Sequence, residues 1–120
     1  MQIIISILIV IVALLHLYFL YFEMFAWETK GRKVFNKFPK ELFASTKEMA
    51  ANQGLYNGFL AAGLIWSLFI TSVEWADNVA LFFLSCVTVA GLYGAYSVDK
   101  KIFFIQGIPA VITILLIVFK

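Results

Sequence analysis

The chain has 120 residues, of which 63% are hydrophobic and only 13% are charged, and its mean hydropathy is +0.97. A water-soluble domain is about 25% charged, and one of this size could not bury so much apolar surface, so we expect lipid to be its main solvent. A formal net charge of +2 is too small to indicate a nucleic-acid partner, and the single cysteine, Cys86, excludes an intrachain disulfide.

Four apolar runs predict four transmembrane helices, each able to cross the hydrocarbon core of a bilayer, about 30 Å thick. The runs cover about residues 3–22, 50–71, 79–97 and 102–119. Pro109 lies inside the last run, where a kink or a freed carbonyl group is expected. The pattern predicts one all-α domain over residues 1–120, an integral membrane four-helix bundle with up-and-down topology.

The one long connection, about residues 23–49, alternates aromatic side chains with lysines. This mixture is typical of a segment that lies in the membrane interface, so we expect a short interfacial helix or turn there. Ser45 and Glu48 have the spacing of a capping box, which predicts that the second long helix starts beside them.

Basic residues predict the orientation, because lysine and arginine in short loops stay on the cytoplasmic side. Eight of the nine basic residues fall in two connections, residues 23–49 and 98–101. Both connections are therefore expected in the cytoplasm and both termini outside it, with a bacterial cell membrane as the expected location. A dual-topology dimer would need its lysines and arginines balanced between the two sides of the membrane, so this distribution argues against one.

Small residues recur every four positions on two of the predicted helices, as packing seams do in membranes. The two rows are Gly54, Gly58 and Ala62, and Cys86, Ala90 and Gly94. These rows predict close helix contacts, either within one chain or between the copies of a homo-oligomer.

Polar side chains gather in the cytoplasmic halves of all four predicted helices. The candidate ligand-binding residues are His16, Glu23, Asn52, Gln53, Asn57, Tyr93, Tyr96 and Gln106. A polar group that faces hydrocarbon costs several kcal/mol, so these groups should face inward and surround a cytoplasm-facing pocket. The alternative is an interhelical hydrogen-bond network that satisfies itself and holds no ligand.

His16 and Glu23 lie seven residues apart, nearly two turns, and should share one face of the first helix. An embedded histidine is a functional candidate by default, and the alternative is a structural hydrogen-bonder. Glu23 is alternatively an interfacial carboxylate, and Tyr93 and Tyr96 are alternatively members of an interfacial aromatic belt.

The sequence lacks the motifs of several classes of functional site. One histidine and one carboxylate seven apart do not have the ligand spacing of zinc or di-iron sites, so no metal is expected. No glycine-rich phosphate loop, nucleophile elbow or paired-cysteine motif occurs. We therefore expect no cofactor and no nucleic acid. The expected partners are membrane lipid and a small-molecule ligand, and a homo-oligomer remains open.

Three groups of residues carry a resemblance over essentially the full length of the chain. They are His16, Tyr18-Phe19, Glu23 and Trp27; the run from Asn52 to Gly63; and Gln106-Gly107 with Pro109-Ala110. In these the chain resembles the small four-helix membrane proteins of the domain of unknown function 1304 family. This resemblance implies the bundle and implies no activity.

A looser resemblance is to the membrane-associated eicosanoid and glutathione metabolism proteins, trimers of four-helix subunits with a polar motif at the start of the second helix. Asn52 and Tyr56, with Tyr93 and Tyr96, occupy comparable places. That family's motif has an arginine before the asparagine and a glutamate after it, where this chain has Glu48 and Leu55. Only the architecture, and not glutathione binding, is expected to carry over.

Three functions remain open at this point. In the first, the pocket binds a small or amphipathic molecule, with transport as the use of binding, and His16 and Glu23 exchange a proton. In the second, the chain is a membrane enzyme on a lipophilic substrate, with His16 as acid or base and Asn and Tyr side chains stabilising the developing charge. In the third, it is an accessory or structural membrane subunit.

Overall fold

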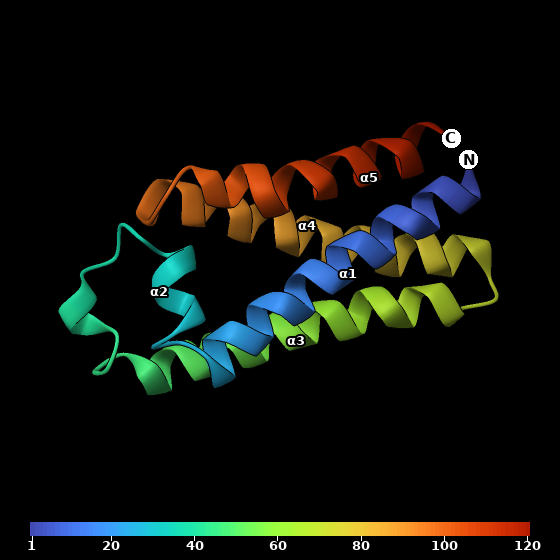
Figure 1. Ribbon diagram of the computed structural model, residues 1–120. Coiled ribbons are helices and arrows are strands. Elements are labelled where there is room, and N and C mark those ends of the chain that lie inside the picture. Colours follow the sequence, from blue (N-terminus) through green and yellow to red (C-terminus); the bar gives the residue numbers. More distant parts are fainter.

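The chain is all-α, and the computed structural model describes all of residues 1–120 (Figure 1). The α-helices are α1 (Gln2–Phe25), α2 (Lys30–Val34), α3 (Lys47–Phe69), α4 (Val73–Ser97) and α5 (Ile108–Phe119). A short 3-10 helix, η1 (Lys40–Leu42), precedes α3, and a π-helix, η2 (Phe103–Gly107), leads directly into α5. The molecule is elongated, 48 × 24 × 17 Å.

The number of α-helices is five, and the prediction of four was wrong. The additional helix, α2, has five residues and forms inside the connection that follows α1. It lies in the connection, residues 23–49, where the mixture of aromatic side chains and lysines predicted a short helix or turn. It closes tightly because Gly31 lies against the ring of Trp27, where an added Cβ would come within 2.8 Å of the ring carbon Cε3.

The start of α3 also differs from the prediction. The N-cap of α3 is Thr46, and no side chain caps the helix there. Ser45 instead donates its hydroxyl to the carbonyl oxygen of Leu42 at 3.2 Å, so the predicted capping box with Glu48 does not form. Serine often makes such local backbone hydrogen bonds in turns, which compete with capping.

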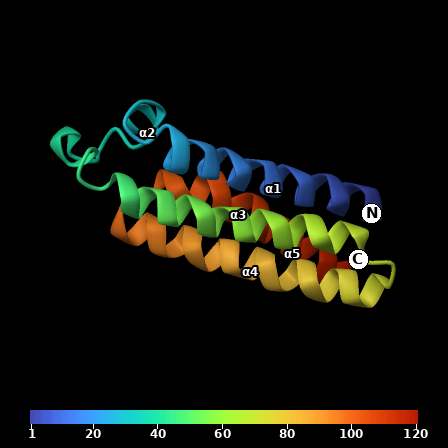
Figure 2. The ribbon, with the colours of Figure 1, turned by 90° about the horizontal axis from the view of Figure 1, so that it is seen from below.

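The long helices form two pairs, α1 with α3 and α4 with α5, and α1 also contacts α5 while α3 contacts α4. In Figure 1 the two pairs diverge toward the end of the molecule that carries α2, and both termini lie at the opposite end. Figure 2 shows the same long axis from below, with α2 and the neighbouring turns projecting beyond the helix ends.

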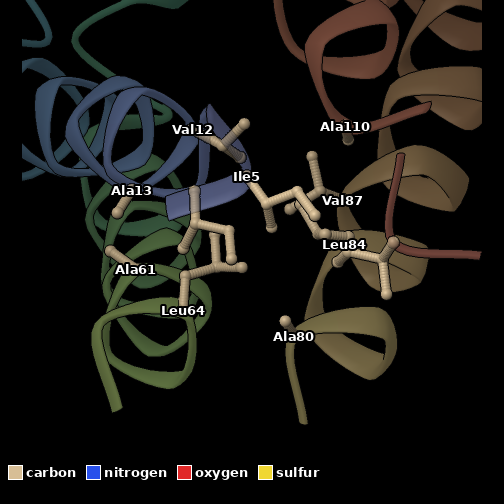
Figure 3. Packing of buried hydrophobic residues seen from close by; sticks show 11 residues of the cluster. Ile5, Val12, Ala13, Ala61, Leu64, Ala80, Leu84, Val87 and Ala110 are labelled. Carbon is tan, nitrogen blue, oxygen red and sulfur yellow. The ribbon is translucent and has the colours of Figure 1, made fainter. Parts of the chain in front are cut away.

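The apolar core lies where the pairs meet, on the side of the termini (Figure 3). Each long helix contributes fully buried side chains, which include Ile5 and Val12 of α1, Leu64 of α3 and Leu84 of α4. Ala110 of α5 belongs to the same cluster. Toward the α2 end the buried residues include Glu23 and Gln106 beside apolar ones such as Phe22.

Glycines set the close approach of α1 and α3. An added Cβ on Gly54 would lie 2.7 Å from Met24 Cγ and 3.0 Å from Glu23 Cβ, and one on Gly58 would lie 2.6 Å from Leu20 Cδ1. These two members of the predicted small-residue row therefore pack within the chain. Their position brings the last turns of α1 against the first turns of α3.

Beside Pro109, where a kink or a freed carbonyl was expected, the structure has the π-helical turn η2, whose last hydrogen bond runs from the Ile108 N–H to the Phe103 carbonyl. Proline lacks the N–H that would continue an α-helical ladder, which favours such a local widening. Gly91 of α4 packs against this turn, since an added Cβ would lie 3.2 Å from Gly107 Cα.

An aromatic cluster orders the connection between α1 and α3. Trp27 packs against Phe35, Phe38 and Phe43, with ring centroids 4.9 to 6.0 Å apart. The indole N–H of Trp27 also donates to the Thr46 hydroxyl at 3.0 Å. The cluster holds α2 and η1 as a folded cap on one end of the long helices.

The outer surface of the long helices is strongly apolar. Exposed large hydrophobic side chains follow α1 from Ile3 to Phe25, and others cover the outer faces of α3, α4 and α5. By length and composition two helices, α1 and α4, are apolar enough to cross a membrane, with mean hydropathies of 3.0 and 1.8 over their best windows.

Candidate functional site

A cavity of about 420 Å³ lies between the two diverging helix pairs, at the α2 end of the molecule. Eighteen residues line it, from α1, α3, α4, η2 and the C-terminal end of α2, and eleven of them are hydrophobic. Its walls are therefore mostly apolar, with a few polar groups at defined places, as in typical small-molecule pockets.

Five of the eight predicted site residues line this cavity: Glu23, Gln53, Asn57, Tyr93 and Gln106. They come from four different elements, α1, α3, α4 and η2. The structure does not bring His16, Asn52 or Tyr96 to the cavity wall.

Glu23 is the most deeply buried polar group of the cavity, with 2% of its surface exposed. Its Oε1 accepts a hydrogen bond of 2.6 Å from Asn57 Nδ2, across the α1–α3 contact that Gly54 permits. Its Oε2 has no hydrogen-bond partner, yet it is not sealed away from the cavity space. No lysine or arginine lies within ion-pair distance of this side chain; its only polar partner is Asn57.

Gln106 reaches the cavity from the π-helical turn and is almost fully buried. Its amide Nε2 donates to the Val87 carbonyl oxygen of α4 at 3.4 Å. Gly91, one turn further along α4, allows the approach, because an added Cβ would lie 3.3 Å from Gln106 Cγ. The glycine thus sets the position of this amide.

Gln53 and Tyr93 stand at the outer part of the cavity, where both side chains are exposed. Tyr93 of α4 is 69% exposed, and Tyr56 of α3, which also lines the cavity, is 60% exposed. The two tyrosines mark a rim between α3 and α4.

His16 is fully buried but lies outside the cavity wall. Its Nδ1 lies 2.8 Å from the Val12 carbonyl oxygen, which places a proton on Nδ1, while its Nε2 is buried without any partner. The ring meets Phe19, a cavity residue, edge to face at 5.2 Å between centroids. His16 therefore packs behind Phe19 without lining the cavity itself, and it forms no hydrogen bond with Glu23.

Asn52 and Tyr96 point away from the cavity. Asn52 is exposed on α3, and Tyr96 is 89% exposed near the end of α4. Each lies on the outer surface of its helix.

Sequence reasoning missed several cavity residues, and most follow a simple helical rule. Phe19 precedes Glu23 by four residues, Ser97 follows Tyr93 by four, and Ile102 precedes Gln106 by four. Side chains four residues apart share a helix face, so the spacing could have predicted these three cavity residues. It could not have predicted Phe35, which follows the short helix α2, or Lys101, which lies between α4 and η2.

The connection before α3 is tied to the α4–η2 turn by charge. Asp99 accepts hydrogen bonds from the backbone N–H of Lys101 at 3.1 Å and from Lys37 Nζ at 3.4 Å, and Lys101 Nζ lies 3.8 Å from its other oxygen. Chiefly the backbone hydrogen bond, and then the two ammonium groups, hold the pKa of Asp99 below its usual value. Lys101 Nζ also donates to the Val34 carbonyl at the end of α2.

The structure contains no cluster of three or more His, Cys, Asp or Glu side chains that could hold a metal ion. What the arrangement offers instead is one buried carboxylate, three amides and several aromatic rings around an open space.

Comparison with known proteins agrees with the sequence resemblance. The profile of the family described as "Protein of unknown function (DUF1304)" matches residues 10–118. The chain is 37% identical over 117 residues to "Uncharacterized protein YpaA" of Lactococcus lactis subsp. lactis (strain IL1403), covering 96% of this chain and 97% of that protein. No solved structure matches the chain significantly. With a match over nearly its whole length, the chain belongs to the DUF1304 family.

Proposed function

We propose that the chain is a small integral membrane protein whose cavity binds a small amphipathic molecule from the cytoplasmic side. The observation that carries this proposal is the buried, incompletely paired carboxylate of Glu23 on a cavity with mainly apolar walls. An amphipathic ligand would satisfy both parts of such a cavity, its polar group at Glu23 and its apolar body against the walls.

The apolar exterior supports placement in a membrane. A helix of 24 residues such as α1 is about 36 Å long, enough to cross a hydrocarbon core of about 30 Å. Exposed apolar side chains follow the outer faces of all four long helices, which is unfavourable in water over so large an area. In the proposed arrangement α1, α3, α4 and the continuous η2–α5 helix cross the membrane up and down, and α2 lies at its surface.

Charge supports the orientation. The α1–α3 connection and the α4–η2 turn lie at the same end of the molecule (Figure 1), and together with Lys47, the first residue of α3, they hold eight of the nine basic residues. Under the positive-inside rule this end faces the cytoplasm, and both termini lie on the opposite side. The cavity, at the same end, then opens near the inner surface of the membrane.

The position of His16 supports ligand binding over the catalytic alternative. An acid or base must come within hydrogen-bond reach of the reacting atom, and His16 does not line the cavity. His16 and Glu23 are also about 10 Å apart along the helix axis, too far for direct proton exchange. Ligand binding, with export of the ligand as the process it serves, is therefore favoured over catalysis.

Membrane placement is tested by cysteine labelling in whole cells, after Cys86 is replaced by alanine. A membrane-impermeant maleimide should label Glu74→Cys, in the first turn of α4, and should fail to label Ser45→Cys until the membrane is opened. Equal labelling of both positions in intact cells would contradict the orientation.

Ligand binding is tested by native mass spectrometry of protein extracted gently from its own membrane. Ala90 lines the cavity, whereas its neighbour Val89 is 65% exposed on the outer face, so Ala90→Phe fills the cavity and Val89→Phe is the matched control. We expect a retained small molecule with wild type and Val89→Phe, and none with Ala90→Phe. Its absence from all three proteins would favour an accessory subunit with a self-satisfied polar network.

A further inference from the structure

We infer that the cavity selects amphipathic organic cations, molecules that join a protonated or quaternary amine to an apolar body. This inference rests on the proposed function and specifies its ligand class. It follows from the charge, the aromatic lining and the size of the cavity, taken in turn.

The charge of the cavity is set by Glu23. Asn57 donates to Oε1, while Oε2 accepts no hydrogen bond from the protein and is not sealed from solvent, and the residue lines the cavity. A buried carboxylate is stabilised by a cation or by further donors, and the chain supplies neither to Oε2. An ammonium group bound in the cavity would supply the missing partner.

Lys101 is the one basic residue that lines the cavity, and its ammonium group is already engaged. Lys101 Nζ donates to the Val34 carbonyl oxygen and lies 3.8 Å from Asp99 Oδ2, so it is held at the rim. It does not come within ion-pair distance of Glu23; its carboxylate partner is Asp99. Glu23 is therefore the one carboxyl group that lines the cavity, and it has no ion-pair partner in the protein, so a cationic group is its natural complement.

Aromatic rings from four segments line the same space: Phe19 and Phe22 of α1, Phe35 after α2, Tyr56 of α3 and Tyr93 of α4. The face of an aromatic ring carries partial negative charge and attracts alkylated ammonium groups, which are weakly hydrated. The same rings offer apolar contact to the body of the ligand. An anionic amphiphile would gain nothing from these faces and would be repelled by Glu23.

The size of the cavity limits the body of the ligand. A volume of about 420 Å³ falls near the lower end of the range of roughly 300 to 1,000 Å³ found for small-molecule pockets. A molecule with one or two rings fits this space, and a lipid with two long chains does not fit within it.

The test measures binding of three probes to the purified protein in lipid nanodiscs. Benzyltrimethylammonium is the cation, benzyl alcohol the neutral probe and benzylsulfonate the anion, and all three carry the same ring. We expect wild type to bind the cation at least tenfold more tightly than either other probe. Ala90→Phe should abolish binding, because it fills the cavity.

The carboxylate is tested with an isosteric substitution. Glu23→Gln should weaken cation binding at least tenfold, Glu23→Asp should retain part of it, and Glu48→Gln, an exposed control on α3, should leave it unchanged. Circular dichroism and thermal unfolding of each variant confirm that the fold is intact.

The outcomes separate the two proposals. If the probes bind and Ala90→Phe removes them, but the cation has no advantage or Glu23→Gln has no effect, the cation inference is overturned and the ligand cavity stands. Preference for benzylsulfonate, or binding of no probe, likewise overturns the inference. The proposed function itself falls only if native mass spectrometry also finds no cavity-dependent ligand.

Discussion

The hydrogen bond from Asn57 to Glu23 allows a quantitative test of the site. Asn57→Leu removes the donor with little change of shape, and it leaves a carboxylate with 2% exposure without a protein partner. At 2.6 Å between Nδ2 and Oε1, the contact belongs to the short, charge-assisted class. Such a hydrogen bond contributes about 1.5 to 3 kcal/mol, and an unpaired buried group carries a cost of similar size.

We therefore expect Asn57→Leu to lower the free energy of unfolding by about 2 kcal/mol, roughly a 30-fold change in the unfolding equilibrium constant. The double variant with Glu23→Met should be more stable than Asn57→Leu alone, because replacing both partners by apolar groups leaves nothing polar unpaired.

The assay is reversible unfolding in mixed micelles, followed by circular dichroism, for the four proteins of a double-mutant cycle. Asn52→Leu, an exposed position on the same helix, is the control and should change the free energy by no more than about 0.5 kcal/mol. A coupling energy near zero between positions 23 and 57 would refute this description of the pair.

Three further predictions concern residues around the cavity. Gly91→Leu should destabilise the protein by about 1 to 3 kcal/mol in the same unfolding assay, because its side chain would push α4 away from the π-helical turn, and Gly91→Ala should cost less. His16→Leu should change the free energy of unfolding by less than about 1 kcal/mol, since Nε2 has no partner and the Val12 carbonyl keeps its helical hydrogen bond; a larger loss would show that the imidazole has a partner. Because the pKa of Asp99 is lowered in the folded protein, its ionised form stabilises the loop contact above about pH 4, the pKa of an unfolded aspartate, and this contribution disappears as the pH falls further toward the folded-state pKa. Asp99→Asn should speed limited proteolysis of the α1–α3 connection at neutral pH and remove the acid dependence seen in wild type, and unchanged cleavage would contradict the tie to Lys37.

The helical architecture and the polar end of the molecule were readable from sequence for a physical reason. Asn57 and Gln106 are conspicuous because each interrupts an apolar run, and Glu23 because it directly follows one; a polar group at such a position is expected to face inward. Their common depth followed from helix rise alone. Helix rise could not predict which two of these side chains form a hydrogen bond, because pairing depends on the register between α1 and α3.

That register is fixed by Gly54 and Gly58, whose contacts with Leu20 and Met24 set how far one helix slides along the other. The small-residue row was visible in the sequence, but its partner helix was not. Since helices related by such a row can meet within a chain or between chains, only the structure shows that Glu23 faces Asn57.

The errors have local causes. His16 shares a face with Glu23, but two helical turns separate them, and the cavity reaches only the last turns of α1. Tyr96 follows Tyr93 by three residues, which rotates it away from the cavity by about 60°. Phe35, which follows α2, and Lys101, which lies between α4 and η2, were not predicted at the cavity because each lies outside the long helices, where periodicity offers no guide.

An open cavity and a sealed polar network differ most directly in whether a reagent can reach Glu23. Dicyclohexylcarbodiimide, a membrane-permeant reagent that couples to carboxyl groups, would be applied to native membranes between about pH 5.5 and 8, and the product mapped by peptide mass spectrometry. An open cavity predicts modification of Glu23 in wild type and in Val89→Phe, and protection in Ala90→Phe and by benzyltrimethylammonium. If Glu23 stays unmodified in wild type across this range while exposed carboxyl groups react, the side chain is sealed inside the protein and the ligand cavity is contradicted.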